Sequence, residues 1–107
     1  MKAYTDLEQS KKLAEILPLE SADMCYIANS ELIDIHEPFY KKMDKEDTPC
    51  WSLSALLDIL PPGKALIHDK GNLGYKCICN NIDTHFHNNP LDAAFEIVCC
   101  LKENGKI

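Results

Sequence analysis

The sequence predicts an α+β fold in which three helices pack on one face of a small, three- to four-stranded antiparallel sheet. Two observations lead to this prediction: apolar residues recur at helical spacing in three segments, and they alternate with polar residues between residues 65 and 87. The length of 107 residues leaves room for one core, so we expect a single domain over residues 1–107. The apolar content of 46% and charged content of 26% are typical of a globular protein and exclude a disordered chain.

The first helix is expected to begin at Thr5, because Thr5 and Glu8 have the spacing of a capping box. The residues that follow at helical spacing predict one buried stripe, formed by Leu7, Ser10, Leu13, Ala14 and Leu17. Pro18 ends the helix, because the residue before a proline is disfavoured in helical geometry. Residues 19–47 are less clearly patterned. The stretch ADMCYIA predicts a short buried strand, and the rest of this segment an irregular or partly helical connection.

The second helix follows Trp51, in the stretch PCWSLSALLDILPPG. Four leucines fall on one face, which we expect to be buried: Leu53, Leu56, Leu57 and Leu60. The sequence PPG then ends the helix. Trp51 either anchors the helix to the core or faces a partner, and we keep it as a candidate partner-binding residue.

Three short strands are predicted by alternation in the segments ALIH, LGYKCIC and IDTHFH. The sequence DKGN, typical of a turn, separates the first two segments. Asn80 and Asn81 separate the second from the third, and asparagine tolerates the positive φ angles of a two-residue hairpin turn. We therefore expect an antiparallel meander.

The last helix is expected to start with Asn89 as its cap and Pro90 in its first turn, and to end at Gly105. Its predicted buried stripe consists of Leu91, Ala94, Ile97, Val98 and Leu101. Helical geometry places Cys99 on the exposed side with Asp92, Glu96 and Glu103. The helix is apolar over more of its circumference than one core contact requires. This excess indicates either a second layer of cover or a subunit contact, and it makes Phe95 and Cys99 candidate partner-binding residues.

The stretch KCICNNIDTHFH contains four side chains of types that bind zinc: Cys77, Cys79, His85 and His87. Each pair shares a face of its strand, so the question is whether the two faces coincide. A two-residue turn at Asn80 and Asn81 predicts these cross-strand pairs: Cys79 with Ile82, Cys77 with Thr84, Lys76 with His85, Tyr75 with Phe86 and Gly74 with His87.

This register places both cysteines in the core with Phe86, and both histidines on the opposite face beside Asp83. We therefore expect no metal and no cofactor. A loop one residue longer would reverse the parity of the second strand. A looser surface site formed by Asp83, His85 and His87 stays an alternative.

Composition also limits the partners. All 11 basic residues are lysines, and the net charge is −6. Arginine is the usual side chain for reading guanine and for clamping phosphate, and negative charge repels a polyanion, so we expect no nucleic-acid binding. No apolar run approaches the roughly 20 residues of a membrane span, and the first residues do not resemble a signal peptide. We expect a cytoplasmic protein that does not bind membranes and keeps its six cysteines reduced.

Three segments carry a resemblance to a known family: YTDLEQSKKLAEILPLESADMCY, CWSLSALLDILP and NPLDAAFEIVCCLKENG. They resemble a family of small uncharacterised proteins of anaerobic gut bacteria, often found in prophage or mobile-element surroundings. The segments cover more than half of the chain, in the same order. The resemblance implies a compact α+β domain in a phage or mobile-element setting, and it implies no catalytic residue.

The leading hypothesis for function is a small non-enzymatic protein-interaction module of phage or mobile-element origin, which binds an unknown protein partner or a second copy of itself. The first alternative is a metal-binding or thiol-redox protein that uses the Cys and His strands. The second alternative is a small enzyme without a recognisable motif, since the sequence lacks a glycine-rich phosphate loop, HExxH and GxSxG.

Overall fold

The computed structural model describes residues 2–27, 31–34, 47–69, 71 and 73–107. Three α-helices, one short 3-10 helix and six strands follow one another in these residues. In chain order they are α1 (Leu7–Ile16), η1 (Leu19–Ser21), β1 (Met24–Ile27), β2 (Glu31–Asp34), β3 (Thr48–Cys50), α2 (Leu53–Ile59), β4 (Ala65–Asp69), β5 (Gly74–Cys79), β6 (Ile82–Asp83) and α3 (Pro90–Glu103). The predicted α+β class and the three predicted helices are confirmed.

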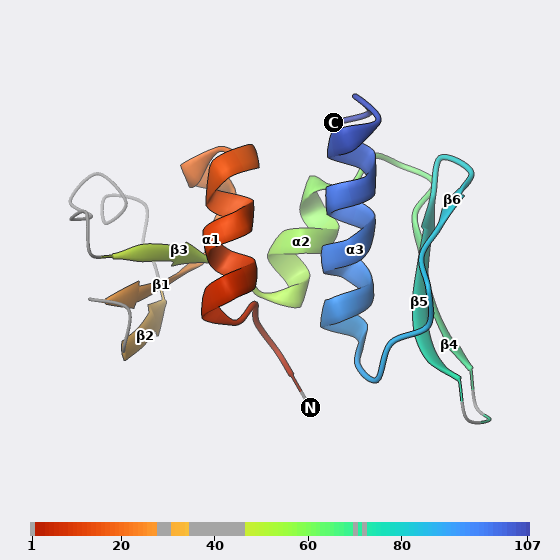
Figure 1. Cartoon of the computed structure of the whole chain (residues 1–107), viewed down its shortest axis with the longest axis horizontal. Helices are drawn as coiled ribbons and strands as arrows, with labels where there is room; N and C mark the ends of the chain where they lie inside the picture. The colour runs from red at the N-terminus through yellow and green to blue at the C-terminus, as the bar shows by residue number, and fades with distance from the viewer. Residues whose placement is uncertain (1, 28–30, 35–46, 70, 72) are drawn as a thin grey trace.

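The strands form two antiparallel three-stranded sheets, with the orders β2-β1-β3 and β4-β5-β6. The three helices lie between these sheets, with α1 next to β3 and α3 next to β5 (Figure 1). We expected one sheet and predicted no strand at residues 31–34 or at residues 48–50, which form β2 and β3. Pro49 is tolerated because β3 is an edge strand. The predicted strand around Cys25 is confirmed as β1, whereas residues 28–30 and 35–46 of the predicted connection lie outside the described residues.

Helix α1 is capped by Asp6 rather than by Thr5. The Gln9 N–H donates to Asp6 Oδ1 at 2.8 Å, and the Asp6 N–H donates to Gln9 Oε1 at 3.1 Å, which completes a capping box one residue later than predicted. Thr5 is fully buried, and its N–H donates to the carbonyl of Trp51 at 2.9 Å. In the predicted stripe, Ser10, Leu13 and Leu17 are buried, but Ala14 is exposed.

Helix α3 agrees with its predicted limits and with its predicted core face. Asn89 accepts a hydrogen bond from the Asp92 N–H, Pro90 begins the helix, and Gly105 follows the C-terminal cap with φ +68°. All five residues of the predicted stripe are fully buried. Figure 1 shows why the helix is apolar on more than one side, since it lies between α2 and the β4-β5-β6 sheet. The excess of apolar residues therefore reflects a second layer of cover.

The main core includes the α3 stripe, Leu56 and Leu60 of the α2 segment, and both cysteines of β5. Of the predicted buried face of α2, Leu56 and Leu60 are buried, whereas Leu53 and Leu57 are only partly buried. Ser52 caps the helix, and Ser54 and Asp58 are exposed. Asn80 and Asn81 have φ angles of 50° and 66°, as a two-residue hairpin turn requires. The predicted meander and this turn are both confirmed.

Candidate functional site

The hairpin pairing changes register after Thr84. Cys79 pairs with Ile82, and the Thr84 N–H donates to the carbonyl of Cys77 at 3.0 Å, as predicted. Farther along, however, Tyr75 pairs with His87 rather than with Phe86, through two hydrogen bonds of 2.8 and 2.7 Å. One extra residue therefore lies in the segment between Thr84 and His87, as in a β-bulge.

This extra residue exchanges the places of two side chains. Phe86, which we predicted in the core, is 37% exposed, and Lys76 Nζ lies 5.3 Å from the centre of its ring. His87, which we predicted on the opposite face, shares a face with Tyr75 and reaches Glu96 on α3. The prediction was wrong for both residues because it assumed an uninterrupted ladder.

The bulge is held by a hydrogen bond to the Thr84 side chain and by a glycine on the opposite strand. Thr84 Oγ1 accepts the Cys77 N–H at 2.9 Å, in place of a backbone carbonyl. Gly74 has φ +93°, and a Cβ atom there would overlap the carbonyl oxygen of His87. Only glycine fits this close approach without displacing the backbone.

Glu96 joins the bulge to α3. Its carboxylate accepts the N–H of His85 at 3.2 Å and lies 3.1 Å from His85 Nδ1 and 2.6 Å from His87 Nε2. Partial burial acts to raise the pKa of Glu96, but the hydrogen bonds from His87 and His85 outweigh it and hold the pKa below its ordinary value. We call these three residues the Glu96 clamp.

The four predicted zinc-type ligands do not converge. Cys77 and Cys79 are fully buried against α3, and burial raises the pKa of the Cys77 thiol. The alternative surface site is not assembled either, because Asp83 lies 3.7 Å from Lys76 Nζ while both imidazoles are directed at Glu96. Within the described ranges, no group of three or more His, Cys, Asp or Glu residues could hold a metal ion.

An open groove of about 440 Å³ runs along α3 beside α1. Its lining includes Gln9, Lys12, His87, Asp92, Phe95, Glu96, Cys99, Cys100 and Glu103. Phe95 is half-buried, and Lys12 Nζ lies 5.9 Å from the centre of its ring. Cys99 is only 7% exposed, so its predicted exposure was wrong, and burial raises its pKa. A neighbouring part of the fold covers the Cys99 side of α3, and the periodicity of the helix alone does not predict this cover.

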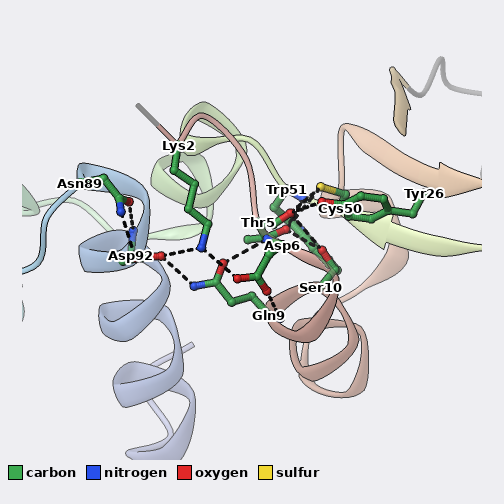
Figure 2. Close-up of polar contacts among 10 residues, drawn as sticks. All are labelled: Lys2, Thr5, Asp6, Gln9, Ser10, Tyr26, Cys50, Trp51, Asn89 and Asp92. Carbon is green, nitrogen blue, oxygen red and sulfur yellow. Dashed lines mark hydrogen bonds and ion pairs between the residues drawn. The ribbon is translucent and has the colours of Figure 1, made fainter. Parts of the chain in front are cut away.

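Trp51 is wholly buried, which contradicts a role in direct partner binding. Its indole Nε1–H donates to Ser21 Oγ at 2.9 Å, and its backbone N–H donates to Thr5 Oγ1 at 3.1 Å. Figure 2 shows Thr5 between Trp51, Ser10 and Cys50, with the Tyr26 hydroxyl donating to the Thr5 carbonyl. Trp51 therefore belongs to a buried network that fixes the start of α1 against β3.

A second polar network in Figure 2 joins the first turns of α1 and α3. Lys2 Nζ donates to Asp6 at 3.0 Å and to Asp92 at 2.9 Å, and Gln9 Nε2 donates to Asp92 at 2.8 Å. Partial burial acts to raise the pKa of Asp92, but hydrogen bonds from Gln9, Lys2 and Asn89 lower it overall. This network supports the fold, and each of its charged groups has an opposite charge beside it.

Exposed apolar side chains gather on the β4-β5-β6 sheet and the turn that joins β4 to β5. Five large apolar residues are exposed in the described part of the chain, and four of them lie in this region: Leu66, Ile67, Leu73 and Phe86. Cross-strand pairs share a face, so Ile67 and Lys76 lie on the face turned away from α3, as do Ala65, Ile78 and Asp83. We call this face, together with Phe86, the outer sheet face.

Sequence reasoning missed this surface. Alternation predicts which side chains share a face, but it does not say how far a helix covers an edge strand. The ALIHD stretch itself carried a signal, because an edge strand without lysine or proline lacks the usual protection against pairing.

No protein-family model, curated protein sequence or solved structure matches the chain. Among the helices of the described residues, none has the length and apolar character that crossing a membrane requires.

Proposed function

We propose that this protein is a non-enzymatic protein-interaction module that binds its partner through β4 and the outer sheet face. The observation that carries this proposal concerns the five exposed large apolar residues in the described part of the chain. Four of them lie on β4, in the turn after it or at Phe86. The largest exposed apolar patch on a monomer is often functional. The phage or mobile-element origin and the cytoplasmic location stay predictions.

The free edge of β4 supports the same surface. An edge strand offers unpaired N–H and C=O groups to an added strand, and proteins usually block such edges with proline, lysine or a very short strand. Edge strand β2 has four residues with an acidic residue at each end, edge strand β3 contains Pro49, and edge strand β6 has two residues. Strand β4 has five residues, contains neither lysine nor proline, and is exposed from Ala65 to His68. It is therefore the edge best suited to strand addition.

Affinity capture from an extract of cells that produce the protein tests the proposal. The tagged chain, a Phe86→Lys variant and a Tyr4→Lys control are compared, and captured proteins, untagged copies of the chain included, are identified by mass spectrometry. Tyr4 is 40% exposed and lies outside the β4-β5-β6 sheet, so its variant adds the same charge elsewhere. We expect a captured protein to be lost with Phe86→Lys and kept with Tyr4→Lys. Identical sets for the wild type and Phe86→Lys would refute the proposal.

The two alternatives receive less support. A metal or thiol-redox role lacks converging ligands among the described residues, and burial raises the pKa values of Cys50, Cys77 and Cys99. An enzymatic role could use His87 and Glu96 at the groove, since an imidazole–carboxylate pair can act in acid–base catalysis. In the described residues, however, the side-chain hydrogen bond of His87 goes to Glu96 and not to a serine or cysteine nucleophile. We therefore propose no reaction.

A further inference from the structure

We propose that the partner at this surface is a second copy of the chain, and that the two β4 strands pair antiparallel across a two-fold axis at Ile67. This inference rests on the proposed function, because it assigns the occupant of the same edge. The result is a continuous six-stranded sheet, with β4 of each copy at its centre. Two-fold symmetric dimers are the commonest closed assemblies of soluble proteins.

The register follows from the length of the strand. Strand β4 covers Ala65–Asp69, so Ile67 is its midpoint. A register centred on Ile67 pairs all five residues and keeps the outer faces of the two sheets together. A shift of the centre by one residue, to Leu66 or His68, would leave two residues of the strand unpaired. A shift by two residues would pair only one residue, and at Asp69 it would also place two carboxylates opposite each other. The central register is therefore favoured.

The contacts formed in this register suit the residues present. Ile67 faces Ile67 of the second copy on the outer sheet face, so the two side chains, each 36% exposed alone, cover each other. On the other face, Leu66 lies opposite His68 of the second copy. His68 stacks on Tyr75 with ring centroids 4.2 Å apart and an interplanar angle of 6°, which gives Leu66 a flat surface to cover.

Charge also favours a second copy here. Residues 64–87 contain three lysines and two aspartates, a net charge of +1, whereas the whole chain carries −6. The negative charge that would separate two copies therefore lies outside this region. Figure 1 shows the β4-β5-β6 sheet at one end of the long axis, so two copies can meet there with their acidic parts apart.

Sedimentation equilibrium of the purified chain from about 1 to about 500 µM tests the dimer. A contact built on one pair of five-residue strands is small and belongs to the weak class below about 1,200 Å², so we expect a reversible dimer. Ile67→Lys should raise the dissociation constant of the dimer by about 30-fold or more, as expected for a central interface residue. Tyr4→Lys should leave it unchanged. Circular dichroism checks that both variants fold.

Cysteine cross-linking tests the register in a Cys100→Ser background, because the other five native thiols are buried. Opposed residues of an antiparallel pair lie about 4.5–5.5 Å apart at Cα, within the range of a disulfide. Ile67→Cys should therefore form a covalent dimer on mild oxidation. Ala65→Cys should give about tenfold less covalent dimer, because Ala65 faces Asp69 of the second copy and not a second cysteine.

Three outcomes overturn the homodimer. One is a dimer that Ile67→Lys does not weaken, and another is equal cross-linking of the two cysteine variants. The third is a purified chain that stays monomeric at every concentration. If that monomer still captures another protein in a Phe86-dependent way, the proposed function survives and only the homodimer fails. If the capture is lost as well, both proposals fail.

Discussion

Replacement of Gly74 by alanine tests the bulge on which the surface depends. Gly74 and Gly63 have nearly equal φ angles of +93° and +91°, but only at Gly74 would a Cβ atom meet another residue, the carbonyl of His87. Gly63→Ala is therefore a matched control for backbone strain alone. Left-handed geometry costs an alanine roughly 1–2 kcal/mol, and this is the loss of unfolding free energy that we expect at Gly63.

At Gly74 the overlap adds to this strain. The His87 carbonyl must move, and its two hydrogen bonds with Tyr75, at 2.8 and 2.7 Å, weaken or break. Each backbone hydrogen bond contributes about 0.5–1.5 kcal/mol, so we expect Gly74→Ala to cost about 1–3 kcal/mol more than Gly63→Ala.

Urea unfolding, followed by circular dichroism at constant pH, measures both variants as shifts of the midpoint with an unchanged slope. The indole of Trp51 provides a fluorescence signal for the same transition. Equal destabilisation of the two variants would show that His87 does not approach Gly74, and the bulge would then have to be abandoned.

Three further predictions concern other parts of the molecule. The pKa of Glu96 is lower in the folded chain than in the unfolded chain, so ionised Glu96 stabilises the fold above its unfolded pKa, and this stabilisation is lost as the pH falls through the folded pKa. Glu96→Gln should lower the free energy of unfolding by about 1–2 kcal/mol at pH 7 and should flatten the acid limb of a plot of stability against pH. Asp6→Ala should cost about 1 kcal/mol in urea unfolding, whereas Glu8→Ala should cost less than about 0.5 kcal/mol, and the reverse order would restore Thr5 as the cap. Ellman's reagent should label at most Cys100 in the folded chain, and prompt labelling of two or more thiols would contradict the buried positions of the remaining five: Cys25, Cys50, Cys77, Cys79 and Cys99.

Local sequence signals predicted those parts of the fold that local geometry decides. Asn80 and Asn81 fixed the hairpin, because both must adopt positive φ and few residues do so readily. The limits of α3 followed from its cap, its first proline and Gly105. In each case the signal lies within a few residues of the feature that it determines.

The errors arose where distant residues decide between local alternatives. Thr5 with Glu8 and Asp6 with Gln9 both fit a capping box, and burial of Thr5 against Trp51 selects the second. The pairing of β1 with β3 joins residues more than twenty positions apart, and periodicity in the sequence does not predict such a pairing. We did not predict the Glu96 clamp, because helical periodicity places Glu96 on the exposed side of α3. Its partners, His85 and His87, lie in the segment that follows β6.

The same bulge connects the stability of the fold with the proposed surface. In an uninterrupted ladder, Phe86 would point to the core and His87 to the outside. The extra residue sends Phe86 to the outer sheet face and brings His87 to Glu96. Three residues hold this arrangement: the Thr84 hydroxyl accepts a backbone N–H, Gly74 lets the His87 carbonyl approach, and Glu96 accepts the His85 N–H. A regular pair of strands uses none of these contacts. These polar contacts therefore keep the Phe86 ring exposed. Exposure of an aromatic ring to water is unfavourable in free energy unless a partner covers the ring. This is the physical reason to regard the outer sheet face as a binding surface rather than as an incompletely covered edge.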